Sequence, residues 1–325
     1  MRAVNPEWDL MGRTYLVLSL VNMAKREPAQ TTEYLKSVDQ IIDETLQMEA
    51  EYGPLHFLMP YARAQPWVLQ PPRSQFVDSE MAMMLAARRA LEDSPRYAEE
   101  VRQRIGYMLA RMEQSELLCA ESYPDECWLF CNTMALAAIR LTDVRDGSDH
   151  AGFLHRWVQT ARARLIDPKT GLLISSFSWR GEPHDGPEGS SIWMAAHCLQ
   201  LVDREFAADQ YTRAAHELAR TTLGFGYARE WPASWRGPTD VDSGPLVPTF
   251  DASAGSSGLA CVAASAFEDP EYLRRLMATL DFAAFPLERD GGLRYCASNQ
   301  VGDAVLMYAM TLGPLWNEAQ RGRQP

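Results

Sequence analysis

The sequence predicts an all-α fold: an (α/α)6 toroid, a double ring of inner and outer helices with long loops and minor hairpins at the mouth. Two observations predict it. Six nearly uncharged segments recur along the chain, and each opens with a small or acidic polar cluster. Charged, amphipathic segments alternate with them. Such a repeat of paired helices indicates one closed architecture, and we expect a single domain over residues 1–325.

The uncharged segments are the expected inner helices, because a helix that is apolar all round is buried all round. They are residues 8–24, 78–91, 125–141, 188–201, 251–267 and 301–316. Their acidic openings are 47 to 69 residues apart, at Asp9, Asp78, Asp125, Glu188, Asp251 and Asp303. The spacing leaves room for one further helix between most of them.

The charged segments are the expected outer helices. Apolar residues recur in them at i, i+3, i+4 and i+7, and the other positions are mostly Arg, Glu and Lys, which is typical of a helix with one face in water. These segments are residues 31–52, 95–113, 152–167, 208–223 and 270–284.

The remaining segments predict loops with little strand. Residues 171–179 and 291–298 are short and follow turn residues, so we expect small hairpins or extended loops. The connections 55–77 and 229–250 are long and rich in Pro, Trp and Arg. Long loops in compact domains are usually functional or disordered, and the aromatic content favours ordered, functional loops here.

Composition excludes several classes of protein. The 325 residues are 46% hydrophobic, enough for a large core, and the net charge of −12 with no basic stripe argues against nucleic-acid binding. No apolar run is long enough for a membrane span. The N-terminal apolar stretch follows scattered acids and lacks a small-residue cleavage site, so we predict no signal peptide and a cytoplasmic protein.

No cofactor signature is present, and we expect no cofactor and no metal. The six cysteines are spread through the chain and should be reduced thiols. Cys127 and Cys131 have i,i+4 spacing but no second ligand pair, which argues against zinc. Residues 224–226 read GFG after a helix, which is the wrong context for dinucleotide binding. The expected partner is a small-molecule substrate.

The inner helix N-termini carry the predicted site, because all six open at one end of a toroid. Taken alone, each of these acids is more readily interpreted as a helix cap than as a site residue, and this holds for Asp78, Asp125, Glu188 and Asp251. Aromatic and thiol groups at the same level favour a pocket in which the pKa values of carboxyl groups are pushed apart. From these residues we predict Asp125, Cys131, Glu188 and Asp251 as catalytic and, as substrate-binding, Asp9, Asp78, Tyr123, Trp128, Asn132, Trp193, Tyr295 and Asn299.

Two of the candidates carry a more specific expectation. Cys131 lies one turn into its predicted helix, where the helix dipole would lower the pKa of a thiol. His197 falls within the apolar run WMAAHCLQL, so we interpret it as a hydrogen-bonded core residue and not as a catalytic one.

The motif SYPDECWLFCN at residues 122–132 resembles the linalool dehydratase/isomerase family, in which a Cys precedes Pro-Asp and a second Cys precedes Asn. The resemblance continues at 91–100, 164–182, 255–267 and 291–316, from about Phe76 onward. It implies an α/α toroid that works without a cofactor, adding or removing water at a tertiary allylic terpene alcohol and shifting its double bond. It also implies a homo-oligomer, because family members assemble into rings.

The resemblance adds site residues one by one. The second active-site cysteine of the family falls on Cys131, and the first falls on Ser122. The catalytic His falls on Glu80, which we add to the catalytic candidates, and a family Tyr falls near Ser190. Ser122 and Ser190 join the substrate-binding candidates. In the family, an N-terminal extension contributes an Asp to the active site. In this chain, Asp9 is the candidate to replace that Asp.

Three hypotheses about function follow. The first is a cofactor-independent lyase or isomerase acting on a small apolar alcohol or alkene, with Glu80 or Asp125 as acid and Cys131 or another carboxylate as base. The second is a carbohydrate-active hydrolase, lyase or epimerase, with paired carboxylates and Trp platforms in an open groove. The third is a toroid that binds a ligand without catalysis, with its carboxylates satisfied as helix caps.

Overall fold

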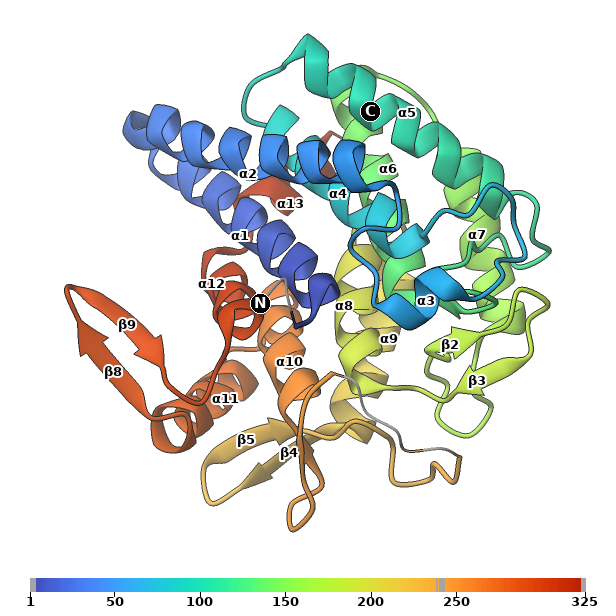
Figure 1. The fold of residues 1–325 in the computed structure, drawn as a ribbon. Helices are drawn as coiled ribbons and strands as arrows, with labels where there is room; N and C mark the ends of the chain where they lie inside the picture. Colours follow the sequence, from blue (N-terminus) through green and yellow to red (C-terminus); the bar gives the residue numbers. More distant parts are fainter. Residues whose placement is uncertain (1–3, 238, 240–242, 323–325) are drawn as a thin grey trace.

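The computed structural model describes residues 4–237, 239 and 243–322 (Figure 1). Helices dominate this part of the chain, and small antiparallel sheets accompany them. The helix-rich class predicted from the sequence is confirmed, and the described residues contain more strand than the minor hairpins that we expected. Within the same residues, no helix combines the length and the apolar character that a membrane crossing requires.

The six uncharged segments form helices that pack against one another in a closed circle. Helix α1 contacts α4, α4 contacts α6, α6 contacts α8, α8 contacts α10, α10 contacts α12, and α12 contacts α1. Figure 1 shows the resulting seam, with the N-terminal α1 beside the C-terminal α12. The bounds are α1 (Pro6–Arg26), α4 (Gln75–Arg89), α6 (Leu129–Asp146), α8 (Gly189–Leu199), α10 (Ala254–Ala266) and α12 (Gln300–Thr311).

The amphipathic segments form helices outside this circle. Helix α2 (Thr31–Tyr52) packs on α1 and α4, α5 (Pro95–Met112) on α4 and α6, α9 (Arg204–Glu217) on α8, and α11 (Pro270–Ala283) on α10. Helix α7 (Ala151–Arg164) buries Phe153, Trp157 and Val158. The shorter helices are η1 (Pro28–Gln30), α3 (Pro60–Ala64) in the first long loop, and α13 (Pro314–Arg321) against α1.

The predicted helix over 208–223 is wrong at its C-terminal end. Helix α9 stops at Glu217, and strand β4 (Ala219–Thr222) pairs antiparallel with β5 (Phe225–Ala228). Leu223 and Gly224 connect the strands with positive φ values of 51° and 90°. Two consecutive residues with positive φ form the tight turn that matches the twist of a hairpin, and Gly224 supplies one of them without strain.

The other strands are short. Strands β1 (Cys127–Trp128), β2 (Ser176–Phe177) and β3 (Pro183–Asp185) form one sheet, β6 (Leu246–Val247) and β7 (Ala252–Ser253) join β4 and β5, and β8 (Pro286–Arg289) pairs with β9 (Gly292–Tyr295). Segments 171–179 and 291–298 therefore each supply one strand of a small sheet, in line with the prediction.

Serine and asparagine side chains cap four of the inner helices, α1, α4, α10 and α12, and no side chain caps α6 or α8. Asn5 accepts a hydrogen bond from the Trp8 amide at 2.9 Å, and Asn299 accepts one from the Gly302 amide at 2.9 Å. Ser74 and Ser253 cap α4 and α10 in the same way. The interpretation of Asp78, Asp125, Glu188 and Asp251 as caps is therefore wrong, because smaller hydroxyl and amide side chains already hold the free amides or no side-chain cap is present.

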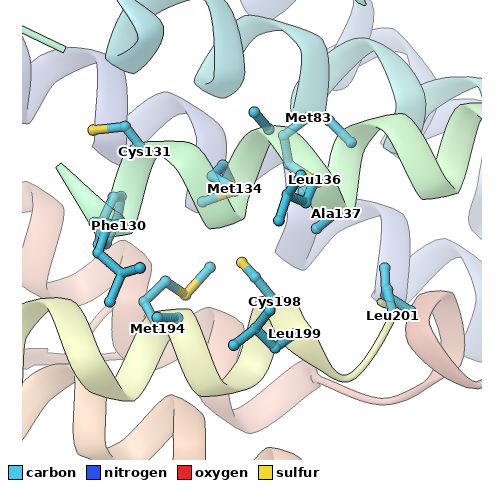
Figure 2. Close-up of a cluster of buried hydrophobic side chains, with 14 of the residues drawn as sticks. Met83, Phe130, Cys131, Met134, Leu136, Ala137, Met194, Cys198, Leu199 and Leu201 are labelled. Carbon is cyan, nitrogen blue, oxygen red and sulfur yellow. The ribbon is translucent and has the colours of Figure 1, made fainter. Parts of the chain in front are cut away.

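The core fills the centre of the circle below the helix N-termini. Figure 2 shows one part of it, where Met83 of α4, Leu136 of α6 and Leu199 of α8 meet. His197 lies in the same core: its Nε2 is 2.8 Å from the Tyr308 hydroxyl, and its ring stacks on Trp316. Burial lowers the pKa of His197 to about 4, so the ring is neutral, and its interpretation as a hydrogen-bonded core residue is confirmed.

Replacing Leu136 with Ala tests the packing of α6 into the circle. Leu136 has no exposed surface, so Leu136→Ala should lower the free energy of unfolding by about 2 to 5 kcal/mol. Leu293→Ala, at a residue of β9 that is 58% exposed, is the matched control and should cost about 0.5 kcal/mol or less. Urea denaturation measures both, and equal effects would contradict the described core.

Candidate active site

A cavity of about 570 Å³ lies where the first turns of the six inner helices meet. Each inner helix contributes to its lining near its N-terminus: Glu7 and Trp8 of α1, Phe76 of α4, Cys131 of α6, Ser190 of α8, Ala254 of α10 and Val301 of α12. Helices in the circle therefore run in one direction and open at one end, which brings residues from across the whole chain to a single cavity.

The cavity has one aromatic wall and one wall of small residues. Trp8, Phe76, Tyr123, Trp128 and Phe130 form the aromatic wall. The Tyr123 ring stacks on Phe76 with centroids 6.3 Å apart. The small residues come chiefly from the start of α10: Ala254, Gly255, Ser257 and Gly258. Because these residues have short side chains, the space beside the start of α10 stays open for a ligand.

Six of the residues predicted from the sequence line the cavity. They are Tyr123, Trp128, Cys131, Ser190, Tyr295 and Asn299. Tyr295 also donates a hydrogen bond to Asp281 at 2.9 Å, and the Trp128 indole donates one to Glu126 at 3.0 Å. Their positions agree with the prediction, and their roles toward a substrate stay predictions.

Asp78 and Asp9, predicted as substrate-binding residues, lie outside the cavity lining. Asp78 is buried and accepts two hydrogen bonds from Arg73, at 2.6 and 2.7 Å, and one from Arg104 of α5 at 3.0 Å. Asp9 pairs with Arg13 at 3.0 Å. Both carboxylates thus satisfy arginines away from the cavity, because a buried charge requires a partner.

Asp125, Glu188 and Asp251 also lie outside the lining. Asp125 is exposed in the turn before β1, where its carboxylate accepts a hydrogen bond from the Trp179 amide at 2.9 Å. Asp251 is 58% exposed and pairs with Arg229 at 3.0 Å. Glu188 is buried at the N-cap of α8 without a side-chain capping bond. These three acids lie one to four residues before the helices they precede, and none of them reaches the cavity lining.

Ser122, Asn132 and Trp193 hold the walls of the cavity without lining it. Asn132 accepts a hydrogen bond from the Ala120 amide at 2.9 Å and donates one to the Ala120 carbonyl at 3.1 Å, which fixes the preceding loop onto α6. The Trp193 indole is buried and donates to Ser256 at 3.0 Å. Ser122 is buried beside Cys131, and its hydroxyl favours the ionised form of that thiol.

Glu7 is the acidic residue that the sequence analysis missed at the cavity. It lies in the first turn of α1, one residue before the segment that we predicted as an inner helix. Its carboxylate accepts a hydrogen bond from the Met59 amide at 2.9 Å. The sequence does contain a signal for a helix that starts at this point. Pro6 is followed by the acidic Glu7, and a Pro at the first helical position followed by an acid marks a helix start.

The Cys131 thiol is neutral, contrary to the expectation of a lowered pKa. Burial raises its pKa most strongly, the Ser122 hydroxyl opposes this, and the charges of Glu80 and Glu7 raise it further. Desolvation therefore outweighs the helix dipole at this position. Cys261 of α10, which the sequence analysis did not select, also lines the cavity, and burial raises the pKa of its thiol to about 12.

Glu80 is fully buried on α4, close enough to Cys131 for their charges to interact, and is not part of the cavity lining. Neither carboxyl oxygen has a hydrogen-bond partner of normal geometry among the described residues. Burial raises the pKa of Glu80 to about 7, and the nearby Thr14 hydroxyl opposes the rise. Burying a carboxyl group with so few polar contacts lowers the stability of the folded protein, and this group ionises in the neutral pH range.

A second buried carboxylate, Glu230, organises the serines at the cavity. It accepts hydrogen bonds from the Ser190 amide at 2.9 Å, the Ser190 hydroxyl at 2.5 Å, the Ser243 hydroxyl at 3.2 Å and the Ser253 hydroxyl. All three serines line the cavity. Among the described residues, no group of three or more His, Cys, Asp or Glu side chains is arranged to hold a metal ion.

The raised pKa of Glu80 predicts a pH dependence of stability. Its pKa in the folded protein, about 7, exceeds the ordinary value of 4.5, so the folded state binds more protons between these values. The contribution of Glu80 to stability is therefore most favourable below about pH 4.5 and is lost as the pH rises through 7. The free energy of unfolding of the wild type, relative to Glu80→Gln, should fall by about 2 to 3 kcal/mol from pH 5 to pH 8.

Urea denaturation of the two proteins at both pH values measures this difference. Glu51→Gln, at an exposed residue of α2, is the control and should show a much smaller change relative to the wild type. A constant difference between the wild type and Glu80→Gln would show that Glu80 titrates normally.

Comparison with known proteins agrees with the geometry. A family model described as linalool dehydratase/isomerase matches residues 81–301, about two thirds of the 325-residue chain. The matched part includes Cys131 and most of the cavity lining, while Glu80 lies just before it. No curated protein is detectably similar to the chain. The chain belongs to the linalool dehydratase/isomerase family.

Proposed function

We propose that the closed circle of helices is the inner ring of an (α/α)6 toroid, and that its cavity is the active site of a lyase or isomerase. The reaction removes water from, or adds it to, a small apolar alcohol or alkene, and the enzyme's own side chains supply the proton transfers without a cofactor. Family membership supports this class of reaction. The observation that carries the proposal is Glu80, a fully buried carboxyl group whose oxygens have no hydrogen-bond partner of normal geometry among the described residues and whose charge acts on the cavity thiol.

Glu80 is the proposed source of the proton. General acids work best when their pKa lies near the working pH, and burial raises the pKa of Glu80 to about 7. About half of the molecules are then protonated at neutral pH. An ordinary glutamic acid would be almost entirely ionised there and could not donate.

Cys131 links Glu80 to the cavity. In the proposed dehydration, the Cys131 thiol gives its proton to the hydroxyl oxygen of the substrate, and a proton from Glu80 replaces it on the sulfur through a bridging water, because no hydrogen bond joins the two side chains directly. The carbon–oxygen bond breaks and water leaves. The thiol is neutral before and after this step, which agrees with its raised pKa. The net donor is therefore Glu80, and Cys131 is the group that touches the substrate.

Glu7 is the proposed base. It is the only acidic side chain among the described residues of the lining, and its charge acts on the Cys131 thiol, which supports a role toward the same substrate. Glu7 would remove a proton from the carbon next to the one that lost the hydroxyl, and the electron pair of that bond would form the new double bond. Trp128 and Tyr295 would stabilise the intervening positive charge through their ring faces.

The two alternatives have less support. A carbohydrate-active enzyme of the usual type needs two carboxyl groups flanking the sugar, whereas Glu7 is the only carboxylate in the described lining. A binding protein without catalytic activity would have satisfied its buried carboxylates, as Glu230 does, and Glu80 is not satisfied. Glu80 is thus a cost to stability that a catalytic role explains.

Substituting Glu80 tests the proposed proton source. Glu80→Gln should lower kcat for dehydration of linalool or a larger homologue by about 100-fold or more, because the amide cannot donate a comparable proton. In the wild type, kcat should decline as the pH rises above about 7, when Glu80 ionises. Gas chromatography of the alkene products measures both effects. Glu51→Gln is the control, and unchanged turnover in Glu80→Gln would refute the assignment.

Substituting Cys131 tests the link to the cavity. Cys131→Ser should lower kcat by about 10-fold or more, because the shorter O–H bond alters the distances to both Glu80 and the substrate. Cys119→Ser is a matched control, since Cys119 is also fully buried but does not line the cavity. Equal activities of the two variants would exclude Cys131 from the reaction.

A further inference from the structure

The cavity extends beyond the inner ring to an outer helix. Four residues of α11 belong to its lining: Leu276, Thr279, Leu280 and Ala283. Their i, i+3, i+4, i+7 spacing places them on one face of α11, so this face borders the cavity along two helical turns. Gly226 and Tyr227 of β5, which packs on α11, also line the cavity, and we refer to the part lined by α11 and β5 as the lateral branch. A compact substrate held at Cys131 would have no need of it.

The volume of the cavity exceeds that of a ten-carbon alcohol. At roughly 30 Å³ per non-hydrogen atom, the density of a liquid, a cavity of about 570 Å³ holds about 19 such atoms. An alcohol of ten carbons has eleven non-hydrogen atoms and would leave roughly two fifths of the space unfilled. A fifteen-carbon alcohol has sixteen, and would fill about five sixths.

Gly258 of α10 is the glycine through which we expect the lateral branch to be controlled. It lines the cavity from α10, and a Cβ atom built on it would meet no atom within 4 Å. Cys261 is one helical turn further along the same face and also lines the cavity. The charge of its thiol affects the pKa of Tyr272 of α11. Burial raises the pKa of Tyr272 most, and Cys261 adds to the rise. This face of α10 is therefore directed toward α11.

We propose that the lateral branch holds the apolar tail of a substrate of about fifteen carbons, and that the missing side chain at Gly258 sets the tail length. The inference rests on the proposed function for the identity of the reacting end, an alcohol at Cys131. Apolar residues of α11, Leu276, Leu280 and Ala283, bind the tail by removing it from water. A larger side chain at position 258 would close the branch and leave the chamber at Cys131 open.

The test measures binding separately from turnover. Quenching of the fluorescence of Trp8 and Trp128, which both line the cavity, gives Kd for linalool, with ten carbons, and for nerolidol, its fifteen-carbon homologue. Wild type should bind nerolidol at least 10-fold more tightly than linalool. Gly258→Leu should weaken nerolidol binding at least 10-fold and change linalool binding less than about 3-fold. Gly258→Ala should have an intermediate effect.

Gly106→Leu is the matched control, because Gly106 is an exposed residue of α5 where an added Cβ also meets no atom within 4 Å. It should leave both Kd values unchanged. Equal binding of the two alcohols by the wild type, or an unchanged ratio in Gly258→Leu, would overturn the inference even if both alcohols are dehydrated. Tight binding of nerolidol without turnover of either alcohol would instead refute the proposed function and leave the inference standing.

Discussion

The contact between α1 and α12 is the constraint on which the rest of the structure depends. These helices lie nearly 300 residues apart in the sequence, and their packing closes the circle of inner helices. Tyr15 of α1 and Tyr308 of α12 meet across it with ring centroids 5.7 Å apart. Closure brings six helix N-termini to one end, and the cavity exists only because they meet there. An open row of the same helices would present these termini along a groove.

The centre of the circle carries two kinds of polar group with opposite consequences. Glu230 accepts hydrogen bonds from three serines and so stabilises the wall of the cavity. Glu80 has no such partners, and neither does the Tyr15 hydroxyl among the described residues. Burial raises the pKa of Tyr15 well above its ordinary value, and the Glu80 charge adds to this. The fold therefore retains two costly buried polar groups, Glu80 and Tyr15, and the charge of Glu80 acts on the Cys131 thiol of the cavity.

Arginines explain why most of the acids expected at the site are elsewhere. Arg104 of α5 and Arg73 hold Asp78, and Arg229 holds Asp251. The sequence pattern places an acid before each inner helix, but it does not show on which side of the helix start that acid lies. For the buried Asp78 the nearest arginines decide, since a carboxylate in a low-dielectric surrounding gains most from a guanidinium partner. Glu7, whose carboxylate accepts a hydrogen bond from the Met59 amide, lies at the cavity.

The sequence by itself determined the alternation of buried and half-buried helices, because apolar periodicity follows directly from which faces are removed from water. It also identified Cys131, Tyr123, Trp128 and Tyr295, since the aromatic and thiol side chains stand at the helix starts that the cavity unites. Only the tertiary structure decided which carboxyl groups matter. Burial and ion pairing depend on neighbours distant in the sequence, and these turned Asp78 into a structural ion pair and left Glu80 protonatable at neutral pH.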